Sequence, residues 1–286
     1  MNGWKRALAL VLALMTWMPL TVAMADDDVE ISFEDTSGII LEENVYDNVV
    51  WNFPVDLSDM DPELVRLANK KVLLPEDFIP DPLVTMKARK EDSEGNNTNG
   101  GVKKVSSDEM KLQEECAQHL VEMFDTALEE GITLYLKSAY RSYRTQKTMY
   151  YNRLENNNGV DDGWVAMPGS SDHQTGLGCD VVPRAWRERP MNGDMGKEKE
   201  CIWMAENCHR FGFILRYPED KQDVTEINYE PWHMRYVGVP VATYIMENGL
   251  CLEEFQDQLQ AAIAEFLQNG GRRSLVEDYI IKTDAD

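Results

Sequence analysis

The stretch from Pro168 to Asp180, Pro-Gly-Ser-Ser-Asp-His-Gln-Thr-Gly-Leu-Gly-Cys-Asp, constrains this chain more than any other. It places His173 seven residues before Asp180, and the small residues between them allow a tight turn followed by extended backbone. About fifty residues later, Glu230-Pro-Trp-His233 supplies a second histidine. Two imidazoles and one carboxylate are the ligands of a catalytic zinc, which keeps its fourth position for water. We therefore predict one Zn²⁺ per chain, bound by His173, Asp180 and His233.

Glu230 is the candidate base of this site. A fourth protein ligand would leave no place for water, so we predict that Glu230 takes a proton from water and returns it to a leaving amine. Arg141, at the end of a predicted strand, could bind a substrate carboxylate or the developing oxyanion; a surface ion pair is the alternative. Cys179 is disfavoured as a nucleophile, because a small residue beside Asp180 on a strand is typical of a buried position. Together these residues predict an amide hydrolase.

Hydrophobic periodicity predicts helices and strands around these motifs. Asp180 falls on one predicted strand and His233 begins another, which favours a metal site over a core histidine packed beside Trp232. Strands are expected at 132–137, 177–182, 213–217 and 233–237. Helices are expected at 62–69, from Ser142 to 156, and between Pro240 and Gly270. A further helix is expected from a Ser106–Glu109 capping box to Gly131. The helix expected at 197–211 should have Ile202, Trp203 and Cys208 on its inner face.

The composition limits the partners and the cross-links. A net charge of −23 disfavours nucleic acid and anionic membranes, so we predict no nucleic-acid partner. The protein is expected to be a monomer. Five cysteines are an odd number. Cys201 and Cys208 lie on one predicted helix about 10 Å apart, which is too far for a disulfide, and no disulfide framework is predicted. His119 and His209 also lie on predicted helices, and both are expected to be structural.

The N-terminus is typical of a secretory signal peptide. Lys5 and Arg6 precede an apolar run at 7–14, and Ala23-Met-Ala25 fits a cleavage site. An uncleaved membrane anchor is the alternative; no other stretch is long enough to span a bilayer. We therefore expect an exported protein that acts outside the cell, at the cell wall or in the periplasm. The expected organisation is a signal peptide at 1–25, an acidic flexible leader at 26–55, a zinc domain with its N-terminal wrap at 56–240, and a helical extension and tail at 241–286.

Four motifs together resemble a known family: Ser138-Ala-Tyr-Arg-Ser142, Gly169-Ser-Ser-Asp-His-Gln-Thr-Gly-Leu-Gly-Cys-Asp180, Gly212-Phe-Ile-Leu-Arg-Tyr-Pro218 and Tyr229-Glu-Pro-Trp-His-Met-Arg-Tyr-Val-Gly238. As a set they are similar to the VanY-type D-alanyl-D-alanine carboxypeptidases of zinc peptidase family M15, subfamily B. The resemblance implies an α+β fold of the hedgehog-like type, in which a small antiparallel sheet flanked by helices carries the zinc site. It implies a role for each of six residues: metal ligand for His173, Asp180 and His233, base for Glu230, and substrate contact for Arg141 and Ser171. Gln146 is a further candidate for substrate binding.

The family also implies a substrate. It predicts release of the terminal D-Ala from peptidoglycan stem peptides that end in D-Ala-D-Ala. An L,D-carboxypeptidase, a D,D-dipeptidase or an endopeptidase of the same family is the alternative, as is a zinc-containing module that binds peptidoglycan without cutting it. Glu230 disfavours the binding module, because binding needs no base beside the metal.

Overall fold

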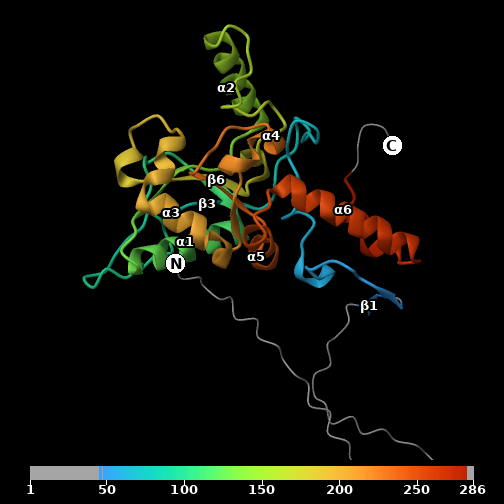
Figure 1. Cartoon of the computed structure of the whole chain (residues 1–286). Coiled ribbons are helices and arrows are strands. Elements are labelled where there is room, and N and C mark those ends of the chain that lie inside the picture. Colours follow the sequence, from blue (N-terminus) through green and yellow to red (C-terminus); the bar gives the residue numbers. More distant parts are fainter. Residues whose placement is uncertain (1–44, 47, 282–286) are drawn as a thin grey trace, which may run out of the picture. The chain divides into compact units, whose positions relative to one another are not determined.

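A four-stranded antiparallel sheet carries the candidate site in the computed structural model, which describes residues 45, 46 and 48–281 (Figure 1). Its strand order is β5 (Leu134–Ser138), β6 (Gly178–Pro183), β8 (His233–Tyr236) and β7 (Phe213–Leu215). All four predicted strands form, and their ends lie within two residues of the predicted ones. The register sets Asp180 of β6 opposite His233 of β8 and opposite Ser138 of β5. The sheet therefore brings two predicted metal ligands together as a cross-strand pair.

Helices flank this sheet, and the predicted α+β fold class is confirmed. The helices are α1 (Glu114–Glu129), α2 (Tyr143–Asn156), α3 (Lys199–Asn207), α4 (Gln222–Thr225), α5 (Val239–Glu247) and α6 (Leu252–Gln268). Two short ribbons add β1 (Val45–Tyr46) with β2 (Val49–Val50), and β3 (Leu83–Thr85) with β4 (Lys111–Gln113). The 3-10 turns are η1 (Leu57–Asp59), η2 (Asp172–Thr175), η3 (Arg184–Trp186), η4 (Gly193–Lys197), η5 (Cys208–Phe211), η6 (Glu219–Lys221), η7 (Arg273–Leu275) and η8 (Glu277–Tyr279). Ser142 caps α2 as predicted, because its side chain accepts a hydrogen bond from the Thr145 amide.

The predicted helix at 62–69 is wrong, and the structure has turns and bends there. The carbonyl oxygens of Leu64 and Arg66 both accept hydrogen bonds from the Arg235 guanidinium, at 2.9 and 2.8 Å. An α-helix would use these carbonyls for its own bonds four residues on. The buried Arg235 side chain therefore holds this segment in a non-helical conformation.

Two further helix predictions need correction. Ser106 does not begin a helix, because its hydroxyl bonds to Asp108, residues 111–113 pair with β3, and α1 starts only at Glu114. Ile202 is 46% exposed rather than inside, whereas Trp203 and Cys208 are buried as predicted. Cys201, Met204 and Cys208 are all buried, so the inner face follows a spacing of three and four residues and Ile202 lies outside it.

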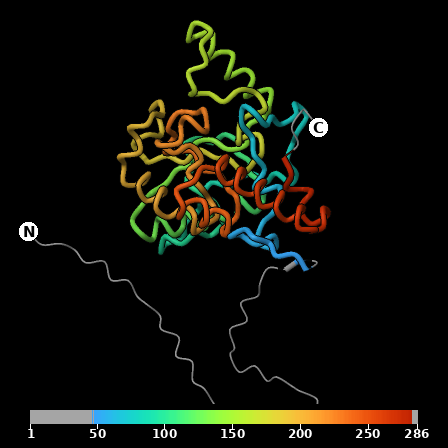
Figure 2. Tube along the Cα trace, turned by 45° about the vertical axis from the view of Figure 1, so that its right-hand side comes forward, coloured from blue at the N-terminus to red at the C-terminus, as the bar shows by residue number. Residues whose placement is uncertain are grey.

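The described residues bury two apolar clusters. The first packs α1 and α3 against the sheet. The second joins the segment 51–67 to α5 and α6, and in Figure 2 this N-terminal segment (blue) lies beside α6 (red). Trp51 packs edge-to-face on Phe266, with ring centroids 5.7 Å apart, and Phe53 packs in the same way on Phe255, also at 5.7 Å. Residues 51–55, which we expected in a flexible leader, are thus held by the C-terminal helix.

The described residues, 45, 46 and 48–281, belong to one compact unit. Among the described residues, no helix combines the length and the apolar character that a membrane span needs. The predicted signal peptide at 1–25 and the leader up to residue 44 lie outside the described residues.

Replacing Trp51 with alanine is expected to lower the free energy of unfolding by about 3–5 kcal/mol, because a buried indole is lost and a cavity remains. Trp51 is 3% exposed, and its indole N–H donates to the Val55 carbonyl at 2.9 Å. Val50→Ala is the matched control, since this neighbouring side chain is 53% exposed. Urea denaturation of both variants measures the difference; equal stability of the two would show that the segment does not belong to the folded unit.

Candidate metal centre and cleft

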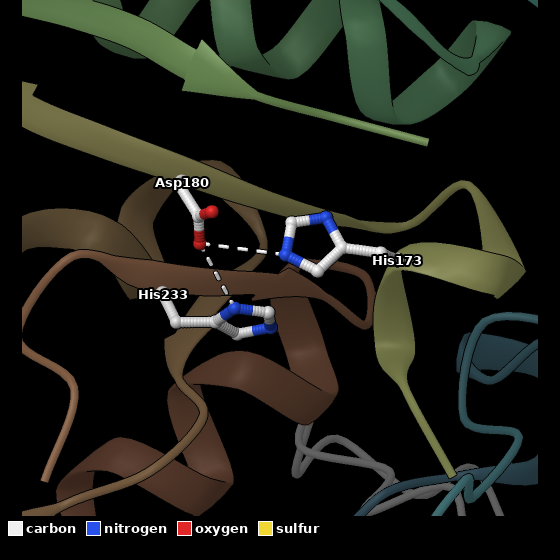
Figure 3. Close-up of side chains that lie close together, drawn as sticks. All are labelled: His173, Asp180 and His233. Atoms are coloured by element: carbon white, nitrogen blue, oxygen red, sulfur yellow. Dashed lines mark hydrogen bonds and ion pairs between the residues drawn. The ribbon is translucent and has the colours of Figure 1, made fainter. Parts of the chain in front are cut away.

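His173, Asp180 and His233 converge, as the spacing predicted (Figure 3). They come from η2, β6 and β8, and one potential ligand atom of each lies within 4.8 Å of the others. Asp180 Oδ1 lies 3.4 Å from His173 Nε2 and 3.1 Å from His233 Nδ1. All three side chains are buried. Two imidazoles and one carboxylate at this spacing fit a single Zn²⁺ with an open fourth position.

His173 is oriented by the end of β5. Its Nδ1 lies 2.7 Å from the Ala139 carbonyl and donates to it, which leaves the Nε2 lone pair facing Asp180. The Arg141 amide donates to the His173 carbonyl at 3.0 Å. Burial, together with the Arg141 charge, lowers the pKa of His173 and favours the neutral imidazole that metal binding requires. The sequence between β5 and α2 therefore fixes both the position and the protonation of this ligand.

The Asp180 carboxylate is the anionic member of the cluster. Burial acts to raise its pKa, but His173 and His233 outweigh this effect and hold the pKa below its ordinary value. Arg141 Nη2 lies 4.0 Å from the other carboxylate oxygen of Asp180. Asp180 therefore stays ionised, which is the state that a metal ligand needs.

Glu230 lies beside the cluster without joining it. Its carboxylate oxygen is 3.7 Å from His233 Nδ1, and its backbone amide donates to the Tyr217 carbonyl at 3.1 Å. Burial raises the pKa of Glu230 well above its ordinary value, and the Asp180 charge raises it further, although Arg141 opposes the shift. A carboxyl group whose pKa is raised takes up a proton more readily than an ordinary carboxylate, which suits a residue that accepts and then returns a proton.

A cleft of about 510 Å³ opens over these residues. Arg141, Gln146 and Ser171, the predicted substrate contacts, all line it. Arg141 Nη1 donates to Gln146 Oε1 at 2.7 Å, and Gln146 Nε2 donates to the Ala166 carbonyl at 2.6 Å. The amide of Gln146 thus already holds Arg141 in place, and this side chain is 1% exposed. The guanidinium of Arg141 therefore lines the cleft and is held in place by Gln146.

The sequence did not indicate the aromatic wall of the cleft. Trp164 and Trp232 stack with centroids 6.3 Å apart, and the Tyr217 ring lies 5.0 Å from the His233 ring. All three line the cleft. Trp164 lies outside the motifs, so only the folded chain brings it to this site.

A buried charge network behind the site was also missed. Arg216 Nε donates to Asp172 Oδ2 at 2.7 Å, and Arg235 Nη1 donates to Asp172 Oδ1. Arg216 also binds both carboxylate oxygens of Glu253 on α6, each at 2.7 Å. A charged residue inside an otherwise apolar predicted strand, as at Arg216 and Arg235, was the available signal.

The other histidines and the cysteines lie outside the cluster. His119 stacks on Tyr236 with centroids 5.2 Å apart, and His209 lies in η5. All five cysteines are buried and free, in agreement with the absence of a predicted disulfide framework. Burial raises the pKa of Cys179 well above its ordinary value, which makes this thiol a poor nucleophile.

Comparison with known proteins identifies the class. A family model described as VanY, D-alanyl-D-alanine carboxypeptidase, matches residues 109–239. The chain is 36% identical over 143 residues to the bifunctional D-Ala-D-Ala dipeptidase and D-Ala-D-Ala carboxypeptidase VanXYC of Enterococcus gallinarum, which covers 49% of this chain and 74% of that protein. It is 40% identical over 151 residues to YodJ of Bacillus subtilis (strain 168), covering 52% and 55% of the two chains. The fold and the donor set are those of a zinc peptidase, and the chain belongs to the VanY family.

Solved structures agree with this assignment. The LdcB LD-carboxypeptidase is 35% identical with a TM-score of 0.60, and the match covers 68% of this chain and 87% of that one. The vancomycin-resistance D,D-pentapeptidase VanY in complex with Zn(II) is 28% identical with a TM-score of 0.50, over 68% and 98% of the two chains. VanYB in complex with D-alanine-D-alanine matches at 28% identity and a TM-score of 0.51, over 68% and 97%. The chain spans about half the length of the first curated relatives that it matches.

His173→Ala and His233→Ala are each expected to abolish tight zinc binding, because each removes one of three protein ligands. His119→Ala and His209→Ala should keep a full equivalent of zinc, and they serve as controls for the loss of a histidine outside the cluster. Metal analysis of the four purified variants after dialysis tests this. Full zinc in either cluster variant would contradict the ligand assignment.

Proposed function

We propose that this chain is a zinc-dependent D,D-carboxypeptidase that removes the terminal D-Ala from peptidoglycan stem peptides. The observation that carries the proposal is the buried cluster of His173, Asp180 and His233 with Glu230 beside it, at the bottom of a cleft that Arg141 faces. Membership in the VanY family and the similarity to a Zn(II)-bound VanY structure support the metal and the chemistry. The similarity to VanYB in complex with D-alanine-D-alanine supports the substrate.

Each residue at the cleft has a task in this reaction. When bound, zinc would be held by His173, Asp180 and His233, and it supplies activation of water and polarisation of the scissile carbonyl. The water oxygen bonds to the carbonyl carbon, and Glu230 takes the water proton. The peptide C–N bond then breaks, and Glu230 returns the proton to the amine nitrogen of the departing D-Ala. No covalent bond between enzyme and substrate forms on this route.

Arg141 and Ser171 would recognise the substrate from the cleft wall. A guanidinium fixed by Gln146 can pair with a carboxylate or stabilise the developing oxyanion. Ser171 is 3% exposed and lies two residues before His173, so a group bound there is close to the metal cluster. Recognition of a free terminal carboxylate would make the protein a carboxypeptidase rather than an endopeptidase.

The second candidate is L,D-carboxypeptidase action, which the similarity to the LdcB LD-carboxypeptidase favours. D,D-dipeptidase activity has the VanXYC similarity in its favour. A binding module without activity would need no buried carboxylate beside the metal cluster. Because the substrate is part of the cell wall, we also propose that the protein acts outside the cytoplasm, with residues 1–25 as its export signal.

Glu230→Gln should keep zinc and fold but lower kcat by about 10²–10⁴-fold, because an amide cannot accept the proton from water. Glu226→Gln is the matched control, since this exposed glutamate precedes the site and does not line the cleft. Zinc content, circular dichroism and the rate of D-Ala release measure the three properties. Near wild-type turnover in Glu230→Gln would remove Glu230 from the mechanism.

A panel of stem peptides separates the candidate activities. Peptides ending in D-Ala-D-Ala are expected to lose one D-Ala, a C-terminal amide should react far more slowly, and a chelator should stop the reaction while a β-lactam leaves it unchanged. Mass spectrometry of the products measures all arms. Equal cleavage of the amide would contradict recognition of the carboxylate, and preference for a tetrapeptide with a single D-Ala would assign the protein to the L,D-carboxypeptidases.

A further inference from the structure

The two ring nitrogens of His233 have different surroundings. Nδ1 faces the cluster, 3.1 Å from Asp180 and 3.7 Å from Glu230. Nε2 is buried and has no hydrogen-bond partner within the described part of the chain. The Oδ2 oxygen of Asp172 lies 3.9 Å from this Nε2. A buried polar atom without a partner beside a carboxylate indicates that the two groups interact in the working protein.

Asp172 is held rigidly on its far side. Arg216 Nε donates to Oδ2 at 2.7 Å and Arg235 Nη1 donates to Oδ1, and none of these three side chains has any exposed surface. The remaining donors of the two arginines bind Glu253 and the carbonyls of residues 64, 66, 68 and 236. Each carboxylate oxygen accepts about two hydrogen bonds, so Oδ2 has capacity for one more donor. The carboxylate cannot turn away from His233 without breaking these bonds.

We propose that Asp172 is a positioning residue of the metal centre, whose Oδ2 accepts the Nε2–H of His233 and thereby keeps the Nδ1 lone pair directed at the metal. The inference rests on the metal assignment in the proposed function. The 3.9 Å separation exceeds a hydrogen bond, so the imidazole turns toward Asp172 when a metal occupies Nδ1. His173 is oriented in the same manner through the Ala139 carbonyl, and each ligand then donates the N–H of its second ring nitrogen to a fixed oxygen.

The charge network offers a matched pair of variants. Asp172→Asn and Glu253→Gln each deprive Arg216 of one anionic partner, and both should lower the melting temperature. Only Asp172 faces His233, so Asp172→Asn should weaken zinc binding by about 10–100-fold whereas Glu253→Gln binds zinc as the wild type does. Competition with a chromophoric chelator measures the zinc affinity of all three proteins. Unchanged affinity in Asp172→Asn, or an equal loss in both variants, overturns the inference.

A measurement on the unaltered protein covers the case in which Asp172→Asn does not fold. In the zinc-loaded protein with ¹⁵N-labelled histidine, the NMR spectrum should show His233 with a slowly exchanging proton on Nε2 and the metal on Nδ1. Metal on Nε2 overturns the inference while leaving the proposed function intact. A wild-type protein that binds no zinc overturns the proposed function, and the inference falls with it.

Discussion

The metal site depends on the ion pairs that the Asp172 carboxylate forms with the fully buried guanidiniums of Arg216 and Arg235. Removing an ion from water costs several kcal/mol, and the cost is recovered only where partners and geometry are complete. Here two arginines face two carboxylates, Asp172 and Glu253, and backbone carbonyls take the remaining donors. Loss of one partner leaves a buried charge unpaired, which typically costs about 3–5 kcal/mol. Any other arrangement of the segments that carry these four side chains would therefore leave a buried charge unpaired.

Two of the segments that carry this charge network, η2 and β8, also carry metal ligands. Asp172 precedes His173 in η2, Arg235 follows His233 by two residues on β8, and Arg216 follows the end of β7. On β8 the side chains of His233 and Arg235 point to the same face, because successive residues of a strand alternate. The β6–β8 register then sets Asp180 beside His233. Charge pairing thus constrains the segments that carry His173 and His233, and sheet hydrogen bonds constrain those that carry Asp180 and His233.

The sequence predicted the local parts of this structure and one distant contact. The strands and the Ser142 cap follow from periodicity and capping, which act over a few residues, whereas the convergence of His173, Asp180 and His233 was predicted from their chemistry as a zinc ligand set. Other distant contacts were missed. The turns at 62–69 do not follow from periodicity, because their carbonyls are committed to Arg235, whose position depends on the completed sheet. Burial of Trp51 likewise depends on a partner, Phe266, more than two hundred residues away. The roles given to Glu230, Arg141 and Ser171 stay predictions that only kinetics can test.

The family match covers every residue that lines the cleft, but only part of the charge network behind it. Arg235 donates to carbonyls of the turns at 64–66, and Arg216 binds Glu253 at the start of α6; all of these partners lie outside residues 109–239. A chain limited to the matched residues would leave the two guanidiniums with one carboxylate between them. Aromatic packing of Trp51 and Phe53 on α6 holds the outer segments together, and through them the oxygens that the arginines need. The turns at 64–66 and the C-terminal helix α6 therefore complete the charge network around Asp172, although neither contributes a metal ligand.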